Sequence, residues 1–466
     1  MNKILPLILF CISISCTDNK ENKDIVYFAG EIVNPTSDFV VLYKDNKPID
    51  SAALDAENRF QFKLENIDEG LHHFDHAPQY QYVYLEKGDS VLIRLNAAPA
   101  YFDESLVFSG DNEEVNNFLI EMFLTNEDEA ALIREYYKLK PEAFSKKIDS
   151  LKKQKTDELK DLFNNVEISE EAKKIASASI IYNSYLHKER YPFYHKKYTG
   201  ESSIHELGKD FYAYRKDLDL NNEELSYFRP YYDFLKHHFG NLSFMDCYKN
   251  CADNAIPENV SMLHINRHKL KMIDSVVSEK KLRNNLFRNI AVDYLIKEHE
   301  ISKESEAFIA DFKALSTNKE HIEEINDLYG NIKSLQINQD LPDLVLECAT
   351  GKEKTLKSIA KNQKTVFYFW TSDRKRHFRN TINLINQLQK ENPSYTFVGI
   401  NLKTGNEEWL NMIAERNLNK ENQYWAKDFK TVQKTLILDN LNKCIIANDT
   451  IIVNGFGTIQ NAFATN

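Results

Sequence analysis

The chain has 466 residues, 42% of them apolar and 28% charged, which is enough apolar material for more than one globular core. Its formal net charge of −11 argues against nucleic acid as a partner. At ~150 residues per domain, this length predicts two or three domains.

The N-terminus is predicted to be an export signal. Lys3 is followed by an apolar stretch over residues 4–12, the length of a signal-peptide core. The segment Ser13-Ile14-Ser15-Cys16 then resembles the bacterial lipobox, where cleavage leaves an acylated cysteine. Residues 1–15 are therefore predicted as a lipoprotein signal peptide and residues 16–24 as a polar tether. Cys16 is predicted as the lipidation site that anchors the protein to a membrane. The alternative is a plain signal peptide with an incidental cysteine.

Residues 25–110 are predicted to form an antiparallel β-sandwich or barrel. Short runs of β-branched and aromatic residues alternate here with turn-forming Asn, Asp, Gly and Pro. The predicted strands are Ile25–Phe28, Phe39–Tyr43, Phe60–Leu64, Tyr80–Leu85 and Ser90–Leu95.

A histidine-rich segment interrupts these strands. His72, His73, Asp75 and His76 are close together. In a strand, His72 and His76 point to one side, whereas His73 and Asp75 point to the other. A metal site is conceivable, but a strand with its hairpin is favoured, and no metal is expected.

Residues 111–335 are predicted to be helical, because apolar residues recur there at intervals of three or four. Gly240 and Pro257 predict an interruption over residues 241–257. Cys247 and Cys251 are four apart, so both would lie on one helix face, and buried thiols are favoured over a disulfide or a zinc site. His237 and His238 are predicted to lie on a solvated helix face.

An aromatic-rich stretch lies in the same helical region. It contains Tyr182, Tyr185, Tyr191, Phe193, Tyr194 and Tyr198, together with His187 and His195. These side chains could form a surface for a glycan or a peptide, but packing between helices is the favoured explanation.

Residues 337–466 are predicted to alternate strands with helices. The strands expected are Leu341–Leu346, Lys364–Trp370 and the buried parallel strand Tyr395–Ile400, followed by an antiparallel pair, Leu441–Ile446 and Thr450–Val453. The helices expected are Thr355–Ala360, Asp373–Glu391, Asn406–Arg416 and a short final helix from Gly457.

The run Lys364–Trp370, the turn after it and the following helix resemble the Phe-Trp-Ala-Ser-Trp-Cys-x-x-Cys signature of the TlpA-like thioredoxin family. This resemblance implies a thioredoxin-like α/β domain over residues 337–466. Aligned on Phe369 and Trp370, the two cysteine positions fall on Arg374 and His377. The segments Tyr84–Ser90 and Phe102–Gly110 likewise resemble the N-terminal β domain that precedes many TlpA-like domains in anchored lipoproteins.

The resemblance implies the scaffold of a thiol–disulfide enzyme without its sulfur chemistry. Such an enzyme needs an attacking thiolate and a second, resolving thiol. Arg374 and His377 provide neither, and the position of the family's cis-proline falls on Asn442, ahead of Lys443 and Cys444. Cys444 could act as a lone thiol near the turn, but a buried, inert residue is favoured for it and for Cys348. No catalytic residue and no cofactor are therefore expected.

The turn could instead bind an anion. Ser372 or Asp373 is predicted to cap the helix, and Arg374, Lys375 and His377 follow at once. Backbone donors and cationic side chains together suit a carboxylate or a phosphate. A drifted, solvated turn without function is the favoured alternative.

We therefore expect an exported, lipid-anchored protein of a Gram-negative-type cell envelope, on the outer membrane or the periplasmic face. Its favoured role is binding or assembly with an envelope protein partner, using the redox-inactive thioredoxin-like surface. The alternatives are a thiol–disulfide oxidoreductase and a lipoprotein that binds a small ligand or glycan through the β domain or the aromatic helices.

Overall fold

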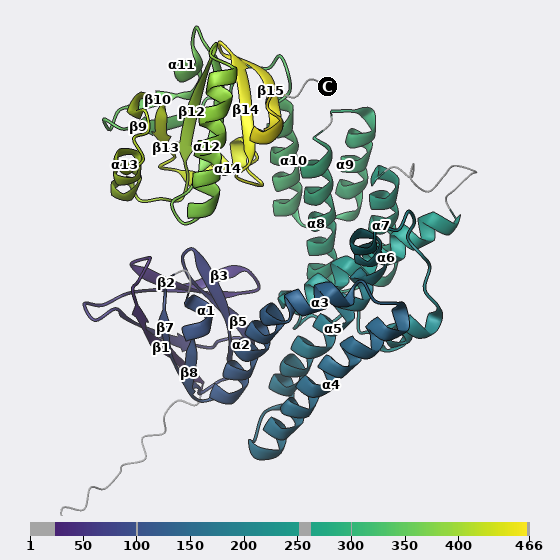
Figure 1. Ribbon diagram of the computed structural model, residues 1–466. Coiled ribbons are helices and arrows are strands. Elements are labelled where there is room, and N and C mark those ends of the chain that lie inside the picture. Colours follow the sequence, from purple (N-terminus) through teal and green to yellow (C-terminus); the bar gives the residue numbers. More distant parts are fainter. Residues whose placement is uncertain (1–23, 99–100, 251–261, 300, 464–466) are drawn as a thin grey trace, which may run out of the picture. The chain divides into compact units, whose positions relative to one another are not determined.

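The computed structural model describes residues 24–98, 101–250, 262–299 and 301–463 (Figure 1). It divides into two compact units: unit 1 comprises Met1–Arg215 and Glu224–Phe234, and unit 2 comprises Lys216–Glu223 and Leu235–Asn466. The predicted helical region is thus shared between the units, and the domain boundaries given above stay a prediction. The signal peptide, most of the tether, Cys16 and Cys251 lie outside the described residues.

Unit 1 begins with two four-stranded sheets, ordered β4-β1-β7-β8 and β3-β2-β5-β6. Inward-facing residues of both sheets, such as Phe28, Phe62 and Phe74, form one buried hydrophobic cluster. The elements are β1 (Ile25–Val33), β2 (Phe39–Lys44), β3 (Lys47–Ala53), β4 (Arg59–Glu65), β5 (Gly70–His76), β6 (Gln79–Leu85), β7 (Ser90–Asn96), the short helix α1 (Phe102–Ser105) and β8 (Val107–Gly110).

All five predicted strands form, but the expectation of purely antiparallel pairing is wrong. β1 pairs in parallel with β7, with Tyr27 opposite Ser90 and Val33 opposite Asn96. The chain passes through the other sheet between these two strands, so no tight hairpin forces them to run in opposite directions.

Four further helices of unit 1 follow the strands. They are α2 (Glu113–Asp128), α3 (Ala130–Tyr136), α4 (Pro141–Asn165) and α5 (Glu170–Thr199). Local signals fix the ends of α5: the Ser169 hydroxyl accepts a hydrogen bond from the Ala172 N–H at 3.2 Å, and Gly200 adopts a φ of +77° at the C-terminus. A 3-10 segment, η1 (Lys209–Asp217), comes next.

The predicted interruption over residues 241–257 is wrong for its first part, because α6 (Arg229–Asn250) continues through Gly240. Phe239 and Cys247 are fully buried in this helix. Burial of its apolar side outweighs the cost of about 1 kcal/mol for a glycine inside a helix. The prediction of a solvated His238 fails for the same reason, since this side chain is 3% exposed.

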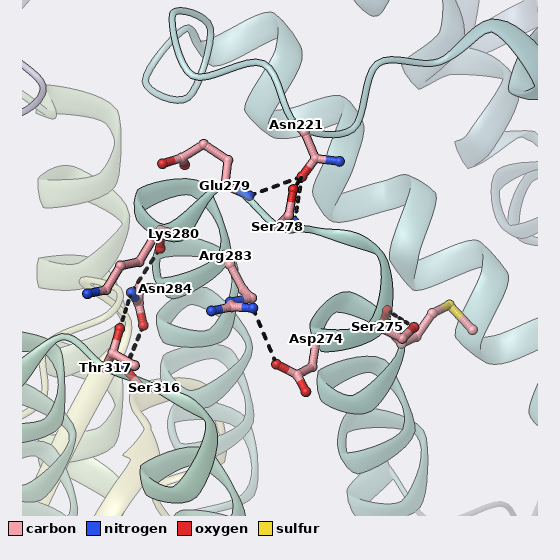
Figure 2. A network of polar contacts seen from close by, with 11 residues as sticks. Asn221, Asp274, Ser275, Ser278, Glu279, Lys280, Arg283, Asn284, Ser316 and Thr317 are labelled. Atoms are coloured by element: carbon pink, nitrogen blue, oxygen red, sulfur yellow. Dashed lines mark hydrogen bonds and ion pairs between the residues drawn. The ribbon is translucent and has the colours of Figure 1, made fainter.

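The helical part of unit 2 contains α7 (Met262–Val276), α8 (Lys280–Glu298), α9 (Lys303–Leu315) and α10 (Lys319–Ser334). A polar network joins the loops between them (Figure 2). The Asn221 side-chain oxygen accepts from the Ser278 N–H at 2.5 Å and from the Glu279 N–H at 3.0 Å. The Asn284 oxygen accepts from the Ser316 hydroxyl at 3.1 Å and from the Thr317 N–H at 2.9 Å. These bonds satisfy backbone donors next to the starts of α8 and α10.

The C-terminal part of unit 2 is a seven-stranded sheet ordered β10-β9-β13-β12-β11-β14-β15. Strands β11, β12 and β13 are parallel, whereas β14 is antiparallel to both β11 and β15. The elements are β9 (Val345–Cys348), β10 (Glu353–Thr355), α11 (Leu356–Ala360), β11 (Lys364–Trp370), α12 (Lys375–Glu391), β12 (Tyr395–Asn401), α13 (Asn406–Glu415), η3 (Lys420–Asn422), β13 (Gln423–Trp425), α14 (Phe429–Thr435), β14 (Lys443–Asn448), β15 (Ile451–Thr458) and η4 (Ile459–Asn461).

This connectivity is that of a thioredoxin-like fold. A parallel β11-α12-β12 unit is followed by the antiparallel pair β14 and β15, as the sequence predicts. The final helix is smaller than predicted, because Gly457 belongs to β15 and only one 3-10 turn follows. In the described part of the chain, no helix is both long and apolar enough to span a bilayer.

Candidate functional site

The turn after β11 connects a buried strand to an exposed helix start. Trp370 is fully buried and its ring packs 4.6 Å from Phe378 on α12. Thr371 and Ser372 are also buried, whereas residues 373–376 are exposed. The sequence therefore places four polar, mostly cationic positions in solvent at one end of α12.

The predicted helix cap does not form. The residue that precedes α12 is Arg374, and no side chain caps the first turn. The Ser372 hydroxyl is engaged elsewhere, because the Thr404 hydroxyl lies 3.3 Å from it and also accepts from the Ser372 N–H at 3.1 Å. Burial of Ser372 against the loop after β12 thus removes it from the helix end. The anion site at this turn stays a prediction.

His377 and Asn442, which the family resemblance aligns with a cysteine and the cis-proline, contact each other. His377 Nε2 is 3.1 Å from the Asn442 side-chain oxygen, which also accepts from Gln460 Nε2 at 3.3 Å. Because that oxygen can only accept, His377 donates through Nε2, and its Nδ1 is left as an acceptor when the ring is neutral. Nδ1 is buried and has no hydrogen-bond partner among the described residues. The described residues thus place a histidine–amide contact in the first turn of α12.

The residues after Asn442, which begin β14, are buried rather than reactive. Cys444 is fully buried in the core of the sheet, and this burial raises the pKa of its thiol to about 12. Lys443 is 4% exposed, and burial lowers the pKa of its ammonium to about 8. Its Nζ donates to the Ile437 carbonyl at 3.1 Å and lies 4.5 Å from the centre of the Phe456 ring. These contacts hold the start of β14 in place. The buried thiol of Cys444 is poorly placed to act as a nucleophile.

Cys348 on β9 departs from the prediction of a buried, inert thiol. It is half-buried, and a hydrogen bond with the Thr350 hydroxyl at 3.1 Å lowers its pKa. The reason is that Cys348 is the last residue of β9, beside the exposed turn of residues 350–352 that leads to β10. Cys348 is therefore more available for reaction than Cys444.

Two buried polar side chains at this end of the sheet are not predicted as site residues from the sequence. Asn401, the last residue of β12, is 0% exposed, and neither its amide oxygen nor its amide nitrogen has a hydrogen-bond partner among the described residues. Thr371, just after the neighbouring β11, has an unpartnered hydroxyl as well. Ligands of open α/β sheets bind at the carboxyl ends of the strands, where both residues stand. The signal in the sequence is a polar residue that closes each apolar strand.

The other clusters singled out in the sequence have structural partners. Strand β5 alternates as predicted: His72 and His76 are buried, and His73 stacks on Tyr43 with ring centres 4.7 Å apart. Burial lowers the pKa of His72 to about 3. Across the described residues, no group of three or more His, Cys, Asp or Glu side chains is arranged to hold a metal ion.

No protein-family model matches the chain, and no curated protein is significantly similar to it. Solved structures that resemble part of it include a thioredoxin-like protein from Bacteroides caccae (16% identity, 50% of this chain and 90% of that chain, TM-score 0.30). A second is a thiol-disulfide oxidoreductase from Bacteroides fragilis (21% identity, 25% of this chain and 88% of that chain, TM-score 0.21). A third is the thioredoxin domain of a thiol-disulfide oxidoreductase from Bacteroides vulgatus (19% identity, 26% of this chain and 88% of that chain, TM-score 0.23). The thioredoxin-like assignment of this part of unit 2 comes from its strand order, β10-β9-β13-β12-β11-β14-β15.

Proposed function

We propose that the thioredoxin-like part of unit 2 is a redox-inactive binding module of an exported, lipid-anchored protein. The observation that carries the proposal is the contact between His377 and Asn442 at 3.1 Å. In the family resemblance these two positions carry a cysteine and the cis-proline, and dithiol exchange needs a pair of thiols that neither residue supplies. Anchoring through Cys16 and the place in the cell envelope belong to the proposal and draw only on the N-terminal sequence.

The exposed turn is the proposed contact surface. Asp373, Arg374, Lys375 and Arg376 project from the start of α12, where helical N–H groups lack a capping side chain. The side chains offer three positive charges against one negative charge, so an acidic segment of an envelope protein is the partner that this surface would attract. The buried, unpartnered Asn401 and Thr371 lie at the ends of the adjoining strands and favour the same end of the sheet.

Affinity purification from membranes tests the proposal. The wild-type protein is compared with the double variant Arg374→Glu and Lys375→Glu, and with a matched control, Lys420→Glu and Lys427→Glu, which reverses two other exposed charges of the same unit. We expect one partner to be recovered with the wild type and the control and to be lost from the turn variant. Equal recovery with all three proteins contradicts the proposed surface.

The competing function is thiol–disulfide exchange through a single cysteine. The observation that favours it is the half-buried Cys348 with its lowered pKa. A lone thiol can form a mixed disulfide, but no second thiol is placed to resolve it in the described part of the chain. Loss of partner recovery in Cys348→Ser under non-reducing conditions would favour this alternative.

A further inference from the structure

Unit 1 contains a cavity of ≈ 660 Å³ that the thioredoxin-like part does not explain. Its size lies within the ~300–1,000 Å³ typical of small-molecule sites. Its walls come from the β5–β6 hairpin, α2, α3, α5 and the start of α6. The residues of α5 that line the cavity are spaced mostly three or four apart, so they share one face of the helix: Ser179, Asn183, Leu186, His187, Arg190 and Tyr194.

The cavity contains an arginine for which the described residues supply no ion-pair partner. Arg190 lines it, and the Nε of its guanidinium is buried without a hydrogen-bond partner among the described residues. An unpaired buried donor costs about 1–3 kcal/mol, more when it is charged, so such a group normally has an acceptor. Burial raises the pKa of the neighbouring Tyr137, and the charge of Arg190 opposes this rise, which places the guanidinium beside that phenol.

The carboxylates that line the cavity have other partners or lie outside its buried part. Asp233 pairs with Arg229 at 3.5 Å, and Asp103 accepts from Gln81 Nε2 at 3.0 Å. Glu127 lines the cavity from an exposed position on α2. Arg134, near the end of α3, adds a second guanidinium to the lining. An anion that enters the cavity would therefore meet Arg190 without displacing an acidic side chain from it.

Aromatic rings form much of the remaining wall. Tyr137 lies 5.0 Å from Tyr194 and 6.2 Å from Tyr198, measured between ring centres. On the side of the hairpin, Tyr82 packs edge-on against Phe228 at 5.5 Å. The predicted aromatic stretch is thus divided: Tyr182 and Tyr185 pack against other side chains of unit 1, whereas Tyr194 and Tyr198 face the cavity. Flat apolar walls of this kind suit a planar ring.

We propose that this cavity binds a small organic carboxylate with an aromatic body. The carboxylate pairs with the Arg190 guanidinium, whose parallel N–H groups match its two oxygens, and the ring packs against Tyr137 and Tyr194. The cavity and the turn at α12 belong to different units of the chain, so this inference stands on residues that the proposed binding module does not use.

Isothermal titration of the purified protein with benzoate, phenylacetate and 4-phenylbutyrate, each beside its neutral amide, tests the inference. We expect at least one acid to bind and its amide to bind about tenfold more weakly or not at all, because the amide carries no charge for Arg190. Inorganic phosphate and an aliphatic acid of equal length are titrated in the same way. Weaker binding of both than of the aromatic acid supports a site that needs the ring, whereas equal binding contradicts it.

Two variants and one control make the result specific. Arg190→Gln should weaken binding of the acid about tenfold or more. Ala130→Trp, which adds a large side chain at an exposed lining position, should block entry without removing a charge. Arg94→Gln removes an exposed arginine of β7 outside the cavity and should leave binding unchanged. Binding of none of the three acids at millimolar concentration overturns the inference. The inference is also overturned if the wild type and Arg190→Gln bind the acid with equal affinity, or if the wild type binds the acid and its amide equally well.

Discussion

Replacing the buried lysine at the start of β14 is expected to remove a pH-dependent contribution to the stability of unit 2. Lys443 is 4% exposed, and its pKa falls from 10.5 to about 8, chiefly because burial disfavours the charged form. The nearby Asp439 opposes the fall only in part. The substitution that isolates this effect is Lys443→Met, which keeps a flexible chain of similar length.

The magnitude follows from the two pKa values. At about 1.4 kcal/mol for each tenfold change in proton affinity, the fall corresponds to about 3 kcal/mol of destabilisation while the lysine is charged in both states. The unfolded chain binds more protons than the folded chain between pH 8 and 10.5, so stability rises with pH in that window. The penalty is complete below pH 8. From pH 7 to pH 10, the wild type should gain about 2 kcal/mol that the variant does not.

Urea unfolding at both pH values, followed by tryptophan fluorescence, measures this difference. The three tryptophans of the chain, Trp370, Trp409 and Trp425, all lie in the thioredoxin-like part of unit 2, so the signal reports this unit alone. Because the other titrating groups are the same in both proteins, their contribution to the pH dependence of the unfolding free energy cancels in the comparison. At pH 7 the variant loses the bond to the Ile437 carbonyl, so its absolute stability matters less than its pH dependence. Equal pH dependence in the two proteins would refute the reasoning.

Three further predictions concern thiols, a buried ion pair and the polar network. Iodoacetamide at pH 8 should modify Cys348 in the native protein but reach Cys247 and Cys444 only in urea, because the latter two are buried; peptide mass spectrometry identifies the sites. Arg215→Ala should lower the stability of unit 1 by about 3–5 kcal/mol in calorimetry, because it leaves the fully buried Glu189 carboxylate without its cation. Asn221→Ala should cost unit 2 about 1 kcal/mol in tryptophan-detected unfolding, since the N–H groups of Ser278 and Glu279 then rely on water (Figure 2).

Each of these has a result that counts against it, and the buried ion pair also has a matched control variant. Labelling of Cys444 as fast as Cys348 would contradict the burial of the former. Lys153→Ala breaks an exposed ion pair with Asp157 and should change stability by less than about 0.5 kcal/mol, so an equal effect of Arg215→Ala would deny the importance of burial. An unchanged midpoint for Asn221→Ala would mean that the network contributes nothing measurable.

The parts of the fold that the sequence predicts well are those with strong local patterns. The run Val366–Trp370 is made of aliphatic and aromatic residues because β11 is covered on both faces, and such a run admits few alternatives to a buried strand. The histidine segment of β5 alternates between core and solvent, so its side assignments also follow from period two. The parallel pairing of β1 with β7 escapes prediction, because it depends on how the chain crosses between sheets.

The candidate sites are less predictable because they combine distant residues. The contact of His377 with Asn442 spans 65 positions, and only the family resemblance brings these two residues to notice. The helix cap fails because Ser372 forms its bonds with Thr404, 32 positions away. Arg190 looks like any other charged residue of an aromatic helix until the cavity around it is seen. The secondary-structure propensities of neighbouring residues carry no information about such contacts between distant parts of the chain.

The most direct measurement of the central claim is reduction of insulin disulfides by the purified protein with dithiothreitol as the electron source, alongside Cys348→Ser and Cys444→Ser. The proposed redox-inactive module predicts that insulin precipitates no faster than in buffer for all three proteins. Catalytic turnover by the wild type that either serine variant abolishes would contradict it.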